Sequence, residues 1–175
     1  MRITVSGHIG SGKSTVSNFL GQLTGFKVYS GGFFFRKLAE DRGMTIEEFN
    51  KFAENDDTMD FILNREIEVF LRDNDNIIVE SRLSGWIAHS SGIDAFKVFL
   101  DAPLDERIRR VGIRETSPDI RNRVISREES EDLRFRNYFN FDMDDKSIYD
   151  AVIDTTEGGA DYVAKKIYSI IFPHG

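Results

Sequence analysis

Two hydrophobic periods alternate along the chain. Short, mostly apolar runs predict buried strands, and segments with apolar residues three or four positions apart predict helices between them. The predicted strands are Arg2–Ser6, Lys27–Tyr29, Ile77–Val79, Phe96–Leu100 and Ala151–Ile153. Alternating strands and helices are typical of an α/β fold, so we expect a five-stranded parallel sheet with helices on both faces.

Local start and stop signals divide the predicted helices. A helix over Phe33–Arg42 is expected to end at Gly43, and Thr45 with Glu48 forms a capping box for the next helix. Ser117–Pro118 is expected to be the N-cap and first residue of a polar helix that runs to about Asn137. The residues expected on buried helix faces are Val16, Phe19, Leu20 and Leu23; Met59, Leu63, Ile67 and Phe70, after a cap at Asp56 or Asp57; Leu104, Ile108 and Val111; and Val163, Ile167 and Ile170.

The segment Gly7–Ser14 joins the first strand to the first helix and fits the phosphate-binding pattern G-x-x-x-x-G-K-[ST]. Glycines let backbone N–H groups curl around a phosphate, and the helix N-terminus adds positive potential. We expect Lys13 to reach the β- and γ-phosphates and the Ser14 hydroxyl to bind Mg²⁺. The motif predicts a P-loop NTPase fold that binds a nucleoside triphosphate through Gly7, His8, Ile9, Gly10, Ser11, Gly12, Lys13, Ser14 and Thr15.

Polar residues follow every predicted strand, at Ser6–Gly7, Ser30–Gly31, Glu80–Arg82, Asp101 and Asp154–Thr155. The carboxyl ends of parallel strands share one edge of the sheet, where ligands bind. We therefore expect one shared site at that edge, with the P-loop as part of it. Glu80 and Asp101 are both candidates to support the water shell of Mg²⁺, although either carboxylate could instead be a structural cap.

Arginine is concentrated in one part of the chain, where nine arginines and no lysine lie between residues 107 and 136. Arginine binds phosphate oxygens in pairs, which favours a mobile flap over phosphates. Acidic residues in the same window also allow a salt-bridged surface helix. Arg127 and Arg134, seven residues apart on one helix face, are the better candidates for phosphate contacts. We expect Arg107 and Arg109 to face solvent, Arg110 to pack on a base, and Arg121, Arg123 and Arg136 to be structural or partly engaged.

Two further arginines lie on the other side of the expected site. Arg36 follows the second strand and Arg82 follows the third. An acceptor that carries its own phosphate needs such cations, whereas a plain alcohol does not. His8 stands at a variable position of the P-loop, and phosphoryl transfer needs no strong base, so we expect no catalytic role for it. His89 and His174 form no metal-ligand pattern with a third residue.

Composition limits the class of protein. The chain has 175 residues, 40% of them hydrophobic, which suits a single domain with a real core. A net charge of -7 argues against bulk attraction to nucleic acid or an anionic membrane. The chain has no cysteine, enters a strand directly after Met1, and has no apolar run long enough to cross a bilayer. We expect a cytoplasmic, monomeric protein without a signal peptide or disulfides.

With these residues in place, the chain resembles the nucleoside monophosphate kinases and, more narrowly, the archaeal-type cytidylate kinases. The segments that carry the resemblance are Gly7–Thr15, Phe35–Ala39, Arg42–Phe49, Glu80–Trp86, Arg127–Glu131, and Ser147–Asp150 leading to Ile153–Thr155. The resemblance implies transfer of the γ-phosphoryl group of Mg·ATP to CMP or dCMP. It also implies one kinase domain with a core (1–30, 73–111 and 138–175), an NMP-binding segment (31–72) and a lid (about 112–137).

The resemblance also implies residue roles. Lys13, Arg127 and Arg134 would be catalytic, Arg110 would stack near the adenine, and Asp154 would lie beside the donor base. The acceptor-binding residues would be Ser30, Arg36, Arg65, Arg82 and Glu131. The chain departs from the family pattern at Ser81, where glycine is usual, at His8, where proline is common, and at the apolar pair Phe33–Phe34.

Three other functions remain open from the sequence. The acceptor is UMP or AMP in the first alternative. In the second, the chain is a regulatory P-loop NTPase, although the GTPase patterns Asn-Lys-x-Asp and Asp-x-x-Gly after a strand are both absent from the sequence. In the third, it is a kinase for a sugar or shikimate-like acceptor, which explains Arg36 and Arg82 less readily.

Overall fold

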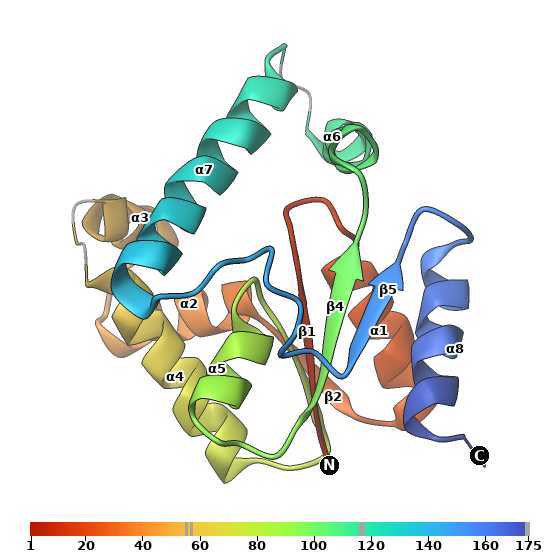
Figure 1. The fold of residues 1–175 in the computed structure, drawn as a ribbon. Coiled ribbons are helices and arrows are strands. Elements are labelled where there is room, and N and C mark those ends of the chain that lie inside the picture. The colour runs from red at the N-terminus through yellow and green to blue at the C-terminus, as the bar shows by residue number, and fades with distance from the viewer. Residues whose placement is uncertain (55, 57, 116–117, 174–175) are drawn as a thin grey trace.

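A computed structural model describes residues 1–54, 56, 58–115 and 118–173. It contains one sheet in the order β2-β3-β1-β4-β5, with every neighbouring pair parallel. The strands are β1 (Arg2–Gly7), β2 (Lys27–Ser30), β3 (Ile77–Glu80), β4 (Phe96–Asp101) and β5 (Ala151–Asp154). The predicted five-stranded parallel sheet is therefore confirmed (Figure 1).

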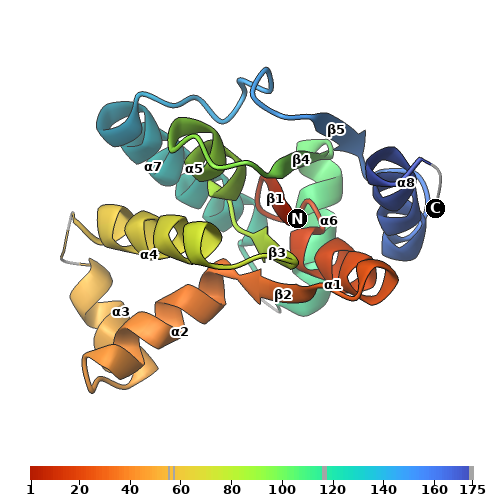
Figure 2. The ribbon, with the colours of Figure 1, turned by 90° about the horizontal axis from the view of Figure 1, so that it is seen from below.

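Helices cover both faces of this sheet, as predicted. They are α1 (Lys13–Thr24), α2 (Gly31–Asp41), α3 (Ile46–Glu54), α4 (Met59–Asp73), α5 (Ser84–Ser90), α6 (Leu104–Arg114), α7 (Ile120–Phe139) and α8 (Ala160–Ile171). One core cluster joins α1 and α8 to one face of the sheet, and a second joins α4, α5 and the end of α7 to the other face. Figure 2 shows these two groups of helices on opposite sides of the sheet.

Four helices frame the site beside the sheet. The helices α2, α3 and α4 share a small core of their own, built on Leu38, Phe49 and Met59. The long helix α7 crosses above the carboxyl edge of the sheet and reaches α4 (Figure 1). None of the helices in the described part of the chain is long and apolar enough to span a membrane.

Side-chain caps account for where several helices begin. The helix α2 begins at Gly31, two residues before the predicted start, because the Ser30 hydroxyl accepts a hydrogen bond from Phe33 N–H. The predicted capping box is confirmed, since Thr45 and Glu48 exchange backbone-to-side-chain hydrogen bonds. Asp56 caps the turn before α4 by accepting from Thr58 N–H.

One predicted helix start is wrong, and two predicted cap residues lie outside the described residues. The prediction that Pro118 is the first helical residue is wrong, because Pro118 lies in a turn and α7 begins at Ile120. Ser117 and Asp57 lie outside the described residues, as does His174. The short helix α5 was not predicted at all.

The buried face of α1 differs from the predicted one. Val16 and Leu20 are buried, but Phe19 and Leu23 are 37% and 40% exposed. The helix is turned so that Gly21 faces β2, where an added Cβ would lie 2.7 Å from Val28 Cγ2. Close packing at a small residue therefore sets the rotation of this helix. On α8, Val163 and Ile167 are buried as predicted, while Ile170 is 43% exposed.

Candidate active site

The loop between β1 and α1 is shaped by glycine. Gly10 has a φ of 79°, and an added Cβ would lie 2.5 Å from the Arg107 carbonyl oxygen. Only glycine fits that position without a clash or strain. The helix α1 begins directly after the loop, at Lys13, so its unpaired N–H groups lie where an anion would bind.

The Lys13 side chain folds back onto this loop. Its Nζ donates to the carbonyl oxygens of Gly7, at 3.0 Å, and His8, at 2.9 Å. Burial lowers the pKa of Lys13 to about 8. A half-buried ammonium held by neutral carbonyls is a good partner for phosphate oxygens.

Ser14 is joined to one of the two candidate carboxylates. Its hydroxyl donates to Glu80 Oε1 across 2.7 Å, and burial raises the pKa of Glu80. Asp101 instead forms a 2.6 Å ion pair with Lys146. A hydroxyl and a carboxylate oxygen side by side are ligands that suit Mg²⁺ directly or through water. The structure therefore places Glu80, and not Asp101, beside Ser14.

A cavity of about 530 Å³ lies beyond this pair, between α2, α3, α4, the end of β3 and α7. We call it the arginine cavity, after four of the residues that line it: Arg36, Arg82, Arg127 and Arg134. They come from α2, the loop after β3, and two turns of α7. Glu131 lines it as well. Five predicted site residues from distant parts of the chain thus meet in one place.

Two predicted acceptor-side residues are not in the wall of this cavity. The Ser30 hydroxyl is engaged in capping α2, which carries Arg36. The Arg65 side chain is 68% exposed, pairs with Glu68, and lines a different cavity of about 350 Å³ beside Trp86. The structure therefore does not bring Arg65 together with the other arginines.

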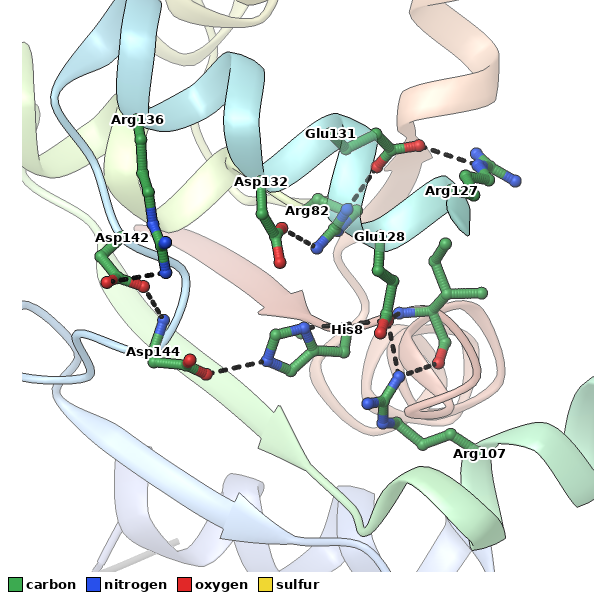
Figure 3. A network of polar contacts seen from close by, with 12 residues as sticks. His8, Arg82, Arg107, Arg127, Glu128, Glu131, Asp132, Arg136, Asp142 and Asp144 are labelled. Carbon is green, nitrogen blue, oxygen red and sulfur yellow. Dashed lines mark hydrogen bonds and ion pairs between the residues drawn. The ribbon is translucent and has the colours of Figure 1, made fainter. Parts of the chain in front are cut away.

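The Arg82 guanidinium is held by carboxylates from α7 (Figure 3). Nη1 donates to Glu131 and Nη2 donates to Asp132 at 2.7 Å, while the guanidinium lies 5.3 Å from the ring centre of Phe135. Its buried Nε has no hydrogen-bond partner among the described residues. Burial opposes ionisation of Glu131, but Arg82 and then Arg127 outweigh it, so the pKa of Glu131 lies below its usual value.

The two favoured arginines of α7 occupy the same helix face, as predicted, and both line the arginine cavity. Arg127 Nε donates to Glu131 Oε1 at 2.8 Å. Arg134 Nε donates to Asp60 Oδ2 at 2.6 Å, which joins α7 to α4. The three arginines predicted to be structural or partly engaged form exposed ion pairs: Arg121 with Asp105, Arg123 with Glu115, and Arg136 with Asp142.

The prediction that Arg107 faces solvent is wrong. Arg107 is 7% exposed and donates to the carbonyl oxygens of Ala102 and Ile9 and to Glu128. The Ile9 N–H donates to the same Glu128 oxygen at 2.9 Å. The helix pattern treats every arginine as polar, so it gave no sign of this contact. Arg109, in contrast, is exposed and pairs with Glu106, as predicted.

Arg110 lies against the loop that follows β5. It donates to Thr155 Oγ1 at 2.9 Å and to the Thr155 carbonyl oxygen at 2.6 Å. A cavity of about 280 Å³ opens here, lined by Arg110 together with P-loop residues and the β5–α8 loop. Asp154 accepts hydrogen bonds from Thr156 N–H and its hydroxyl, so it shapes the loop from outside that cavity.

The remaining candidates have structural surroundings. His8 packs edge to face on Phe99 and lies between Glu128 and Asp144 (Figure 3), and burial lowers its pKa. Trp86 packs on Phe139 and Phe141. Of the three consecutive phenylalanines, Phe34 is buried in the core and Phe35 lines the arginine cavity.

Solved structures share this architecture at low sequence identity. An uncharacterised protein from Eubacterium ventriosum aligns with a TM-score of 0.74, 17% identity and coverage of 99% of both chains. Shikimate kinase from Acinetobacter baumannii, a P-loop kinase, aligns with a TM-score of 0.62 and 16% identity, over 98% of this chain and 93% of that one. These likenesses show the P-loop kinase fold and nothing finer.

Sequence relatives are much nearer. A cytidylate kinase of Thermoplasma acidophilum is 46% identical over 157 residues, which span 89% of this chain and 84% of the relative. A cytidylate kinase of Natronomonas pharaonis is 43% identical over 173 residues, or 98% and 89% of the two chains. A sequence model of the cytidylate kinase-like family matches residues 2–157. With the loop, its lysine and the arginine cavity all present, the chain belongs to the cytidylate kinase-like family and is a kinase.

Proposed function

We propose that the chain transfers the γ-phosphoryl group of Mg·ATP to CMP and dCMP, yielding ADP with CDP or dCDP. The observation that carries this proposal is the convergence of Arg36, Arg82, Arg127 and Arg134 on one cavity beside the Ser14–Glu80 pair. An acceptor that already carries a phosphate accounts for four cations around one cavity. The choice of cytosine is supported by the relatives, which are named cytidylate kinases.

We assign the donor to the P-loop side. The N–H groups at the start of α1 and the Lys13 ammonium bind and orient the phosphate oxygens. Ser14 and Glu80 hold Mg²⁺, which when bound offsets charge on the β- and γ-phosphates. Arg110 packs beside the adenine at the 280 Å³ cavity, with Asp154 supporting the adjoining loop.

We assign the acceptor to the arginine cavity. Arg36 and Arg82 bind the acceptor phosphate, which must compete with Glu131 and Asp132 for the Arg82 guanidinium. Ser30 supports this wall by capping α2, and Glu131 orients the arginines on either side of it. Asp101 is left as a structural partner of Lys146.

The transfer itself needs positioning more than proton chemistry. An oxygen of the acceptor phosphate attacks the γ-phosphorus, while the bond to the β,γ-bridging oxygen breaks and its electron pair leaves on ADP. Arg127 stabilises the charge that spreads over the equatorial oxygens, and Arg134, on the same helix face, adds to the positive potential of the cavity. Closure of α7 over both substrates excludes water, which would otherwise accept the phosphoryl group.

The division of the chain follows from these assignments. Residues 31–72 form the acceptor-binding segment, about 112–137 form the lid, and 1–30, 73–111 and 138–175 form the core. We further propose that the enzyme is a monomer. Gel filtration with light scattering at assay concentration tests that assignment.

A coupled ADP-release assay with CMP, dCMP, UMP, AMP and GMP tests the function directly. We expect CMP and dCMP to stimulate ATP turnover most. If no monophosphate stimulates turnover, the kinase proposal fails, and acceptor-independent hydrolysis would identify a regulatory ATPase instead. If AMP or UMP clearly exceeds CMP, only the assignment of the base fails. Shikimate and simple sugars serve as acceptors without phosphate.

A further inference from the structure

The wall of the arginine cavity formed by α4 carries polar groups that the transfer step does not use. We propose that Asp60 and Asn64 read the base of the acceptor and select a pyrimidine with an exocyclic amine over one with a carbonyl at the same position. This inference rests on the proposed function, because it assigns the base end of the same acceptor site.

The contacts of α7 place these residues away from the phosphates. Glu128 touches the P-loop at Ile9, and Glu131, one turn further along, pairs with Arg82. Arg134, almost one more turn along, pairs with Asp60. At 1.5 Å per residue, the helix advances roughly 9 Å from the first contact to the last. The α4 wall is therefore the end of the cavity farther from the P-loop.

Asn64 presents a buried and unsatisfied amide at this end. It lines both the arginine cavity and the neighbouring cavity beside Trp86. Its Nδ2 is buried and has no hydrogen-bond partner among the described residues. Unpaired buried donors are rare because they are unfavourable, and they point to a missing acceptor. Both pyrimidines offer O2 as such an acceptor.

Asp60 supplies the discrimination between the two bases. Its Oδ2 accepts from Arg134, and Oδ1 lies outside that hydrogen bond. An ionised carboxylate can only accept hydrogen bonds. Oδ1 therefore suits the exocyclic amine of cytosine, whereas the carbonyl at the same position of uracil meets a second acceptor. A site built on such a pairing rejects the mismatched base because a buried polar group is left unpaired.

The shape of the surroundings fits a flat ring. Phe35, Leu63 and Phe135 line the same cavity and supply apolar surface beside the polar pair. Apolar and aromatic walls with a few placed polar groups are typical of small-molecule sites. The ring would be covered by these side chains while its edge meets α4.

The test compares kcat/KM for CMP and UMP in wild type, Asp60→Asn, Asn64→Leu and Arg65→Ala. Asparagine has nearly the same shape as aspartate but offers an amide donor to the uracil carbonyl. We expect Asp60→Asn to lower the CMP-to-UMP ratio of kcat/KM by about tenfold or more. Arg65→Ala, next to Asn64 on the exposed face, is the matched control and leaves the ratio unchanged.

Asn64→Leu has a second readout that does not depend on turnover. We expect its melting temperature without ligand to equal or exceed that of wild type, because an unpaired buried amide is removed. We expect CMP to raise the melting temperature of wild type and to leave that of Asn64→Leu unchanged. If this variant does not fold, Asn64→Ser is measured in the same way.

Two results overturn the inference and can be told apart from failure of the proposed function. If Asp60→Asn lowers kcat/KM for CMP and UMP equally, Asp60 acts only by holding Arg134. If Asn64→Leu retains the CMP-induced shift, its amide does not touch the base. If wild type phosphorylates no monophosphate, the proposed function itself fails and the base end has no acceptor to read.

Discussion

Arg107 of α6 donates to Glu128 of α7 across 2.6 Å, and both side chains are buried. The same Glu128 oxygen accepts the N–H of Ile9, so the P-loop backbone, α6 and α7 meet at one carboxylate (Figure 3). This contact fixes one part of α7 to the P-loop. The arginine cavity lies further along the same helix.

Removal of Arg107 should destabilise the fold strongly. Arg107→Met leaves Glu128 buried without its cation, and breaking a buried pair in this way typically costs about 3–5 kcal/mol. Arg109→Met is the control, because its exposed pair with Glu106 should contribute at most about 1 kcal/mol. Urea unfolding of both variants measures the difference. Equal stabilities would mean that the buried pair does not hold α7 in place.

Removal of the Lys13 ammonium should abolish turnover without unfolding the chain. Among the described residues, Lys13 donates to the carbonyls of Gly7 and His8, so its main partner is expected to be phosphate. Loss of one such preorganised contact typically lowers kcat by about 10²–10³-fold. Lys13→Ala is measured by ADP release, with circular dichroism as the check on folding. Near-normal activity in a folded variant would contradict this role.

Glu80 and Asp101 should respond differently to magnesium. Glu80 accepts from Ser14, whereas Asp101 pairs with Lys146. We expect Glu80→Gln to raise the Mg²⁺ concentration needed for half-maximal turnover by about tenfold, which corresponds to 1.4 kcal/mol. Asp101→Asn should leave it within about twofold. Magnesium titrations at saturating ATP measure both, and the reverse pattern would reassign the carboxylate.

The acceptor-side arginines should separate into two groups. Arg36 lines the arginine cavity, whereas Arg65 lies outside it. Arg36→Met should raise the KM for CMP by about 10-fold or more, as expected for a lost charge-assisted hydrogen bond. Arg65→Met should change it by less than about twofold. A large effect of Arg65→Met would place that residue in the acceptor site after all.

The stabilising effect of Glu131 should disappear in acid. Its pKa is lowered in the folded state because Arg82 and Arg127 outweigh the opposing effect of burial. Its contribution to stability is therefore present above the unfolded pKa, near 4.5, and is lost as pH falls through the lower folded value. At pH 7 we expect Glu131→Gln to be less stable than wild type by about 1–3 kcal/mol.

Urea unfolding at pH 7 and at successively lower values measures this dependence. The difference between wild type and Glu131→Gln should shrink steadily below about pH 4.5. Glu129→Gln, on the same helix, controls for a general effect of charge. A difference that stays constant down to pH 3 would show that Arg82 and Arg127 do not shift the carboxyl.

Local sequence patterns predict an element correctly where contacts between residues close in sequence decide its structure. The strand β3 is buried at all four positions, and a continuous apolar run is the pattern such a strand requires. The capping box of Thr45 and Glu48 was readable for the same reason, because both partners lie within one helical turn. The helix α5 was not readable, since its seven residues are held by packing of Ile87 and Ala88 against the sheet.

The chain by itself therefore determined the parallel sheet, the phosphate-binding loop and the supply of arginines from which a site is built. Only the tertiary structure decided which arginines are buried in ion pairs, which line the arginine cavity and which face solvent. Arg107 and Arg109 lie two residues apart on one helix, yet one is buried against Glu128 and the other is exposed. Arg36 and Arg65 are both exposed, yet Arg36 lines the arginine cavity and Arg65 lines the cavity beside Trp86. Ion pairs between elements depend on how whole helices dock, and no spacing along the sequence encodes that.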